Sequence, residues 1–226
     1  MFLKVILSEI SKFFRKIITN THQEGFIYVF FALIITILGF IISDVLGFIL
    51  LIGAMWCIYF FRDPERIINH DENLISAPGD GIIVDISTRA PHEETGIEEE
   101  MYKVSIFLSV FNVHVNRMPV AGTVERVIYH KGAFLNASVD KASDENERNT
   151  VIVKNDNGKF VLVQIAGLIA RRIVCTAVAG QNVEAGQKYG IIKFGSRVDI
   201  YFPKNYKIKV QKGQTMVGGE TVIAEK

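Results

Sequence analysis

The stretch GQNVEAGQ, residues 180–187, returns in altered form as GQTMVGGE, residues 213–220. Both begin with Gly-Gln, have an apolar residue three positions after that glycine, and have another glycine six positions after it. A further repeat, PGDGIIV (78–84) and PVAGTV (119–124), places Pro-x-x-Gly before an apolar run. Glycines at such offsets supply the positive φ angles of tight turns between short strands. The repeats therefore predict a compact β-barrel sandwich with glycine turns.

From Asp63 onward the composition is that of a soluble β-rich domain, so the predicted fold class is mainly β (α+β). The turn NDNG (155–158) predicts a hairpin, the acidic segment 91–100 predicts a solvated loop tip, and a short helical pattern covers 136–147. The pattern resembles the flattened barrels of biotinyl and lipoyl carrier domains, but the chain has no Met-Lys-Met loop of a carrier. The predicted strands are 81–86, 102–110, 123–129, 150–154, 160–167 and 171–179.

The excess of hydrophobic residues lies between Gly25 and Phe61. Two apolar runs, 26–43 and 45–61, flank one charge, Asp44. At 1.5 Å per residue each run is about 26 Å long as a helix, close to a bilayer core of about 30 Å. We therefore predict a membrane helical hairpin that spans or dips into the bilayer, with a buried soluble hairpin as the alternative. A secretory signal peptide fits poorly, because the run is too long and has no small-residue cleavage site.

The charges around this hairpin predict its orientation. The positive-inside rule places both ends in the cytoplasm and Asp44 at the tip. Residues 1–20 have the apolar spacing of an amphipathic surface helix. We expect a membrane-attachment region at 1–62 and a catalytic β-rich domain at 63–226, on the cytoplasmic side of the cell membrane. The flanking basic residues are Lys4, Lys12, Arg15, Lys16, Arg62 and Arg66.

Composition also argues against several classes of function. The formal net charge is +1 and there is no basic domain, so no nucleic-acid partner is expected. Cys57 and Cys175 lie far apart in apolar surroundings, which indicates a reducing compartment without disulfides. The chain has no HxH or HExxH motif, so we expect no metal site and disfavour a metallopeptidase. The histidines outside residue 114, at positions 22, 70, 92 and 130, show no metal-ligand spacing.

One strand changes character along its length. In SIFLSVFNVHVNRMP (105–119) the even positions are apolar up to Val110, and then become Asn112, His114 and Asn116. Because side chains alternate between faces, His114 continues the line of a core face after that face has turned polar. A strand that enters a cleft has this pattern, and so does a hydrogen-bonded, half-buried histidine. By themselves, Asp80 in APGDG reads as a turn residue that caps its own backbone, and Gly195-Ser196 as a bend.

Six segments, taken in order, are similar to one known family. The chain resembles the phosphatidylserine decarboxylases, most closely their short form of bacteria and archaea. The segments are YFFRDPER (59–66), APGDG (77–81), FNVHVNRMP (111–119), DKASDENERN (140–149), GLIARRI (167–173) and KFGSRVD (193–199).

The resemblance implies a function and a mechanism. The protein would cut its own Gly195–Ser196 bond, giving a large beta chain (1–195) and a small alpha chain (196–226) that stay together as a heterodimer. Ser196 would become a covalent pyruvoyl group, the only cofactor, with His114 as the base and Asp80 orienting it. The pyruvoyl group would form a Schiff base with membrane phosphatidylserine and hold the electrons released with CO₂, so that phosphatidylethanolamine is produced.

Some features depart from that pattern or leave choices open. Longer family members carry a second histidine where this chain has Arg117, so His114 is assigned both cleavage and proton handling. The NER segment (146–148) either lines the site or anchors a loop. Lys141 and Arg148 are candidates for the lipid phosphate, or solvated charges. The alternative functions are an archaetidylserine decarboxylase and a membrane-anchored lipoyl-like adaptor without enzymatic activity, although an adaptor of the efflux type would need a coiled coil that the sequence lacks.

Overall fold

The computed structural model describes residues 20–132, 146–167, 172–193 and 195–226. Contacts divide the chain into two compact units, the first ending at Glu65 and the second running from Arg66 to Lys226. This division lies close to the boundary at 62/63 expected from composition. Nearly all of the predicted amphipathic helix at 1–20 and of the helical pattern at 136–147 lies outside the described residues.

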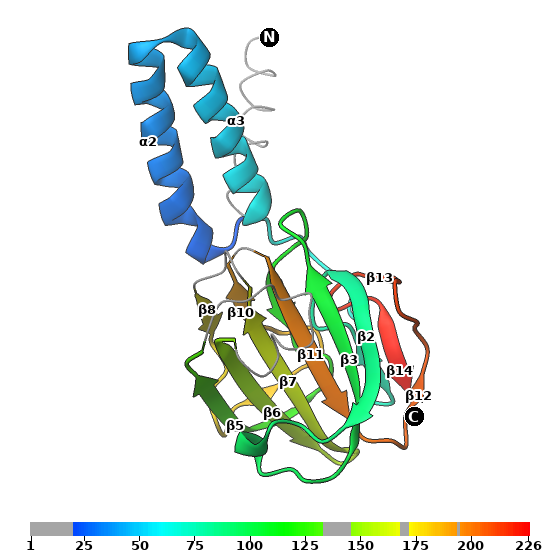
Figure 1. Cartoon of the computed structure of the whole chain (residues 1–226). Helices are drawn as coiled ribbons and strands as arrows, with labels where there is room; N and C mark the ends of the chain where they lie inside the picture. Colours follow the sequence, from blue (N-terminus) through cyan, green and yellow to red (C-terminus); the bar gives the residue numbers. More distant parts are fainter. Residues whose placement is uncertain (1–19, 133–145, 168–171, 194) are drawn as a thin grey trace, which may run out of the picture. The chain divides into compact units, whose positions relative to one another are not determined.

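The first unit contains two apolar helices that form a hairpin (Figure 1). Ser43 separates them, because its backbone is extended and its hydroxyl accepts a hydrogen bond from Leu46 N as the N-cap of the second helix. Gly47 lets the helices approach closely, since a Cβ atom there would lie 2.2 Å from Phe40 Cδ1. The apolar segment Gln23–Ile42 is long enough to cross a membrane by length and composition. The elements are η1 (Gln23–Gly25), α2 (Phe26–Ile42) and α3 (Asp44–Phe60).

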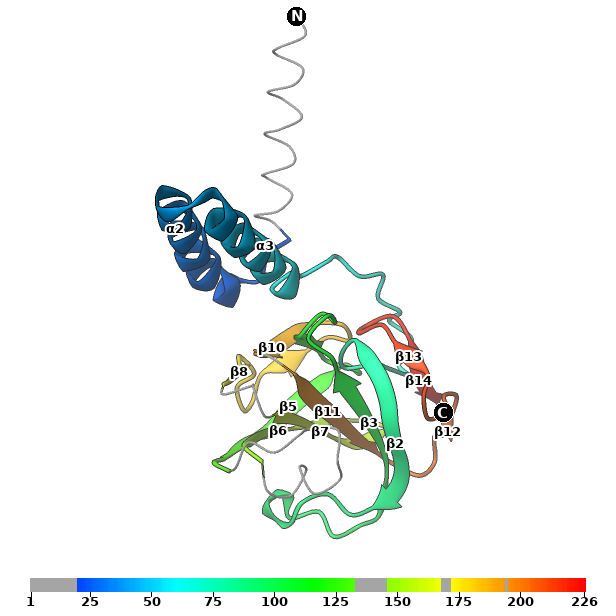
Figure 2. The ribbon, with the colours of Figure 1, turned by 45° about the horizontal axis from the view of Figure 1, so that its top comes forward.

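The second unit is built from β-strands, as the glycine repeats predict. An eight-stranded antiparallel sheet, ordered β13-β2-β3-β11-β7-β6-β5-β9, curls around the core, and the three-stranded sheets β1-β14-β12 and β4-β10-β8 complete the unit (Figure 2). The elements are β1 (Leu74–Ser76), β2 (Gly81–Arg89), η2 (Glu93–Thr95), β3 (Met101–Leu108), β4 (Val115–Arg117), β5 (Gly122–His130), β6 (Arg148–Asn155), β7 (Gly158–Ala166), β8 (Ile173–Cys175), β9 (Asn182–Val183), β10 (Lys188–Ile192), β11 (Ser196–Phe202), β12 (Lys207–Ile208), β13 (Thr215–Met216) and β14 (Val222–Glu225).

The internal repeats correspond to equivalent places in two halves of this unit. In one half β13 pairs with the start of β2, and in the other β9 pairs with the start of β5 in the same register. Ile83 N donates to Gln214 O at 3.0 Å, and Val124 N donates to Gln181 O at 2.8 Å. Each half has a β-bulge just after these residues. The halves are therefore related by a pseudo-twofold arrangement, with β11 and β7 paired at its centre.

The central strand β11 is buried on both faces. Val198 and Ile200 belong to the main hydrophobic core, whereas Arg197 and Asp199 point to the opposite face and form a buried ion pair, with Nε to Oδ1 at 2.6 Å. Lys103 of β3 lies 3.5 Å from Asp199. Burial alone would raise the pKa of Asp199, but the charges of Arg197 and Lys103 hold that pKa below its ordinary value.

Two local expectations were wrong. The acidic segment 91–100 is not simply a solvated tip, because Thr95 is buried and Ile97 packs against a second hydrophobic cluster. The predicted strand 171–179 is reduced to Ile173–Cys175 among the described residues. In the segment 91–100 tertiary packing overrides the local composition, whereas the hairpin at 155–158 is confirmed by the Asn155–Gly158 pair.

Candidate active site

Ser196 is the first residue of β11, where that strand enters the sheet. It pairs with Leu108 of β3 on one side and with Ala166 of β7 on the other. Its side chain is fully buried, and its hydroxyl makes no hydrogen bond within the described part of the chain. A buried hydroxyl without a partner is unfavourable for folding, so it is a candidate for a functional group.

The residue before it has an unusual backbone. Gly195 has φ +49°, in the left-handed region that residues with a Cβ atom rarely adopt. Space is not the constraint, since a Cβ at Gly195 would meet only Val110 Cγ1, at 3.9 Å. The Gly195–Ser196 bond therefore joins a left-handed residue to a regular strand.

The pseudo-twofold arrangement explains why the chain turns here. In one half, the Asn155–Gly158 pair closes the hairpin between β6 and β7. The equivalent pair in the other half is Leu108–Ser196, where β3 and β11 are neighbours but are separated in sequence by residues 109–195. The Gly195–Ser196 bond therefore lies where the other half has a hairpin turn. Ser196 already belongs to the hydrogen-bonded strand β11, whereas Gly195 lies outside it.

His114 lies next to the segment that leads into Ser196. Its carbonyl accepts a hydrogen bond from Ile192 N, 3.4 Å away, at the end of β10, and the chain then reaches β11 within a few residues. The His114 ring is buried, and Nδ1 lies 3.0 Å from the Asn112 carbonyl oxygen. Because a carbonyl can only accept, Nδ1 carries the hydrogen and Nε2 keeps the lone pair. This is the tautomer that a general base requires.

Asn112 itself does not extend the polar face that alternation predicts. Its Oδ1 atom accepts hydrogen bonds from Ser109 N at 2.9 Å and from Ser109 Oγ at 2.7 Å, closing a turn after β3. Its side chain thereby holds the turn, and its carbonyl orients His114. Alternation along one strand does not reveal where that strand ends.

In the described part of the chain, Asp80 binds Arg66 and the backbone of Gly218 rather than His114. Its carboxylate accepts from Arg66 Nη2 at 3.0 and 2.8 Å and from Gly218 N at 2.8 Å, and within the described residues it makes no hydrogen bond with His114. Asp80 therefore caps a remote backbone group rather than its own. The role of Asp80 in orienting His114 stays a prediction. Arg66 is a partner that sequence reasoning missed, although it lies in the segment YFFRDPER.

The NER segment lies beside the Ser196 pair. Asn146 Nδ2 donates to Ala166 O at 2.7 Å, and Ala166 N donates to Glu147 O at 2.9 Å, while Ala166 faces Ser196 across the sheet. This placement favours a role in lining the site. Arg148 points away and binds both carboxylate oxygens of Glu94, at 2.9 and 2.5 Å.

The remaining positions of interest from the sequence are Arg117, Lys141 and any group of metal ligands. Arg117 is buried and donates from Nη1 to Gly186 O at 3.2 Å. Lys141 lies outside the described residues. Among the described residues, no three His, Cys, Asp or Glu side chains group as metal ligands.

A chain of buried amides near the site was not anticipated from the sequence. Asn149 Nδ2 donates to Gln164 Oε1 at 3.1 Å, and Gln164 Nε2 donates to Asn116 Oδ1 at 2.8 Å. All three side chains are buried. The available signal was the presence of amide residues in otherwise apolar strands.

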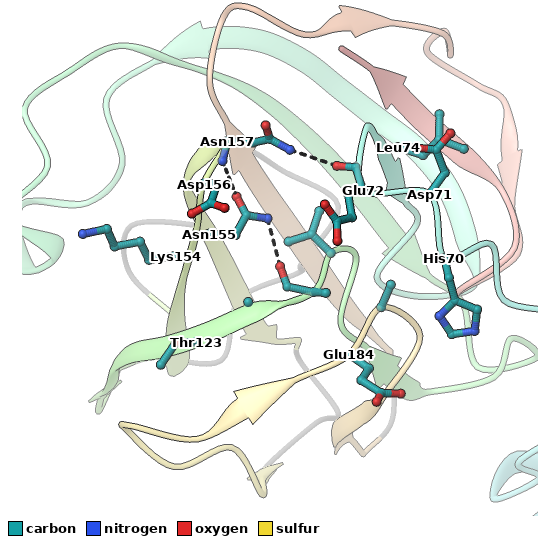
Figure 3. Close-up of a pocket in the computed structure, with 14 residues that line it drawn as sticks. His70, Asp71, Glu72, Leu74, Thr123, Lys154, Asn155, Asp156, Asn157 and Glu184 are labelled. Atoms are coloured by element: carbon teal, nitrogen blue, oxygen red, sulfur yellow. Dashed lines mark hydrogen bonds between the residues drawn. The ribbon is translucent and has the colours of Figure 1, made fainter.

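A cavity of about 650 Å³ lies at the 155–158 hairpin, in the other half of the pseudo-twofold arrangement (Figure 3). Hydrogen bonds at its edge join Asn157 Nδ2 to Glu72 O at 3.0 Å and Asn155 Nδ2 to Ala121 O at 2.9 Å. Ser196, His114 and Asp80 are not among its lining residues. This cavity is therefore separate from the candidate site.

Comparisons with known proteins agree with one another. The profile of the family described as phosphatidylserine decarboxylase matches residues 54–224. A phosphatidylserine decarboxylase proenzyme of Rickettsia akari is 49% identical over 206 residues, covering 90% of this chain and 89% of the relative. One from Ehrlichia canis is 46% identical over 211 residues, covering 92% of each chain.

Proposed function

Because this chain belongs to the phosphatidylserine decarboxylase family, we propose that it uses a pyruvoyl group made from its own Ser196. It is a lyase of phospholipid biosynthesis that converts phosphatidylserine to phosphatidylethanolamine, and it is made as a proenzyme. The observation that carries the site assignment is the buried Ser196 hydroxyl without a hydrogen bond, directly after the left-handed Gly195. The experiment that tests it is the mass of the denatured protein, as one chain or two.

Self-cleavage would begin with an acyl shift. Ser196 Oγ attacks the Gly195 carbonyl carbon, the peptide bond between that carbon and the Ser196 nitrogen breaks, and an ester forms. The hydroxyl proton passes to His114 Nε2 and from there to the departing Ser196 nitrogen. The Nδ1–H···O=C contact with Asn112 supports this role, because it keeps Nε2 as the acceptor.

Elimination then separates the chains. Removal of the Ser196 Cα proton breaks the Cβ–Oγ bond, so residues 1–195 leave with a carboxylate and residue 196 becomes dehydroalanine. Tautomerisation, addition of water and loss of ammonia yield the pyruvoyl terminus. That group supplies an electrophilic carbonyl that accepts the substrate amine and stores the electron pair released with CO₂. The small Ala166 and the buried start of β11 fit a group no larger than the serine that precedes it.

We propose that Asp80 assists His114, and its contacts define a discriminating experiment. Asp80→Asn weakens the bidentate contact with Arg66, and we expect cutting to slow by about 10- to 100-fold, comparable to the loss of one charge-assisted hydrogen bond. The measurement is the fraction of cut chain against time after pulse labelling.

Arg66→Gln serves as the matched variant. If Asp80 acts by holding the loop at 77–81, Arg66→Gln slows cutting as much as Asp80→Asn does. If Asp80 leaves Arg66 to orient His114 directly, Arg66→Gln cuts at the normal rate. Normal cutting by Asp80→Asn would remove Asp80 from the mechanism.

We propose that helices α2 and α3 attach the protein to the cell membrane, with the β-unit on the cytoplasmic side. Most of their large apolar side chains are exposed, which fits contact with lipid. A chain that begins at Asp63 is expected to remain largely in the soluble fraction, whereas the full chain is expected to sediment with membranes and require detergent. Activity of the truncated chain should fall more on bilayer substrate than on a short-chain soluble analogue. Full-length protein that stays soluble without lipid or detergent would contradict the attachment.

A further inference from the structure

The pseudo-twofold arrangement shows that the buried amide chain is not a requirement of the fold. The Asn149–Gln164 pair between β6 and β7 corresponds to an aromatic pair between β3 and β11, and the position of Asn116 opposite Gly190 corresponds to an isoleucine opposite Ala224. The other half therefore fills the three equivalent positions with core side chains. These are Tyr102, Phe202 and Ile75.

The hydrogen bonds among the three buried amides all run from donor to acceptor in the order Asn149, Gln164, Asn116. Asn149 donates to Gln164 and Gln164 donates to Asn116, so the Asn116 carboxamide uses its oxygen as an acceptor. Its Nδ2 atom is buried and donates to no group within the described residues. Burying an amide N–H without an acceptor opposes folding. The fold does not require an amide there, because the other half fills the equivalent positions with core side chains. The three amides thus leave the Asn116 Nδ2 hydrogens available for an acceptor atom that forms only during the reaction.

The donor lies at the end of β11 that carries Ser196. Gln164 faces Val198 across the sheet, two residues from Ser196 and on the same face. A Cβ atom placed on Gly79 would lie 3.3 Å from Asn116 Nδ2 and 3.5 Å from Leu108 Cδ2, and Leu108 is the residue paired with Ser196. His114 precedes Asn116 by two positions and leads into the same strand. Asn116 Nδ2 therefore lies near Leu108, the residue that pairs with Ser196.

We propose that Asn116 donates this N–H to the Gly195 carbonyl oxygen during the acyl shift. When Ser196 Oγ adds to the Gly195 carbon, the carbonyl π electrons move onto that oxygen, and they return when the C–N bond breaks. A preorganised donor in a buried site stabilises this transient charge. Gln164 holds the Asn116 carboxamide in place by its hydrogen bond to Oδ1. The inference rests on the proposed self-cleavage.

The experiment follows the cutting of pulse-labelled chains on denaturing gels and by mass spectrometry. Asn116→Leu removes the donor and places an apolar side chain where the other half has Ile75. Asn116→Asp keeps an acceptor for Gln164 but has no N–H. Both are expected to cut about 10²- to 10³-fold more slowly than the wild type, the effect of losing one donor of this kind. Ile75→Leu, at the equivalent position of the other half, is the control and should cut at the wild-type rate.

Two further readouts separate this role from a structural one. In a Ser196→Ala background, where every chain is uncut, Asn116→Leu leaves Gln164 Nε2 without its acceptor, so its thermal midpoint should fall by only a few degrees and the variant should stay folded at the temperature of the cutting assay. Hydroxylamine cleaves an ester but not an amide at neutral pH, so it should release no fragment from Asn116→Leu.

The outcomes that overturn the proposal are distinct from failure of self-cleavage itself. A wild-type chain that remains uncut would refute the proposed function. With a cut wild type, normal cutting by either Asn116 variant refutes the donor role. Fragments released from Asn116→Leu by hydroxylamine would place the defect after the acyl shift and refute it as well. Slow cutting by variants that are already unfolded at the temperature of the cutting assay would assign Asn116 to folding.

Discussion

Ser196→Ala is expected to remain one uncut polypeptide of 25.4 kDa and to have no decarboxylase activity. The variant has neither the nucleophile for the acyl shift nor the atoms from which a pyruvoyl group is made. The wild type is expected to give two fragments, 1–195 and 196–226, the smaller with a blocked amino end that reacts with carbonyl reagents. Borohydride added with phosphatidylserine should trap an adduct on the small fragment. Denaturing mass spectrometry detects both the fragments and the trapped adduct.

The controls for this prediction come from the chain itself. Ser76 is also buried, but its Oγ atom donates a hydrogen bond to Pro119 O at 3.2 Å, so Ser76→Ala should cut normally. Ser196→Cys and Ser196→Thr keep a nucleophile on the β-carbon and should cut slowly. An active wild-type enzyme with an intact 193–199 segment would exclude the pyruvoyl mechanism.

The small fragment should stay bound after the cut. Its first strand, β11, lies between β3 and β7 and is hydrogen-bonded to both along its length. Asp199 and Arg197 in that fragment also contact Lys103 and Ser105 of the large one, with Arg197 Nη2 to Ser105 Oγ at 2.8 Å. We therefore expect native mass spectrometry to detect the intact pair without any disulfide.

His114→Ala is expected to accumulate as uncut precursor, with cutting slowed by about 10²- to 10⁴-fold, the usual contribution of a general base. The physical reason is that the serine hydroxyl is a weak nucleophile unless a neighbouring atom takes its proton. The Asn112 carbonyl fixes His114 with Nε2 as that acceptor. The measurement is the cut fraction against time after pulse labelling.

A second histidine provides the comparison. His130 is largely exposed and lies 3.6 Å from Glu94, so His130→Ala should cut like the wild type. Normal maturation of His114→Ala would require another base, and Arg117 cannot serve because its guanidinium does not deprotonate in proteins.

Several features could be predicted from local sequence alone. Glycine spacing at 180–187 and 213–220 predicts turns, and these turns do flank the short strands β9 and β13. The apolar runs on both sides of Asp44 predict two helices, which the structure contains. Such features depend on the conformation of a few consecutive residues. The Gly195-Ser196 pair was different, since the dipeptide alone reads as a bend and only resemblance to a family marked it as a cleavage site.

The partners of the site residues could not be predicted in this way. Alternation placed His114 on a polar continuation of a core face, but it did not indicate that the Asn112 carbonyl orients the ring. Likewise, Asp80 was expected to cap its own turn and instead binds Arg66 and the backbone of Gly218. The contacts of Asp80 join segments 14 and 138 residues apart, whose relative positions depend on the closure of the sheets.

The sequence by itself determined the order of Asp80, His114 and Ser196 along the chain, and its resemblance to a family nominated them for the chemistry. The tertiary structure decided which of them meet: Ser196 with Leu108 and Ala166, and Gln164 with Asn116. The physical reason is that the period of a strand sets the face of each side chain, whereas its neighbours depend on sheet order and register. That order brings β3 and β11 together across residues 109–195 and makes the Gly195–Ser196 bond the counterpart of a hairpin turn.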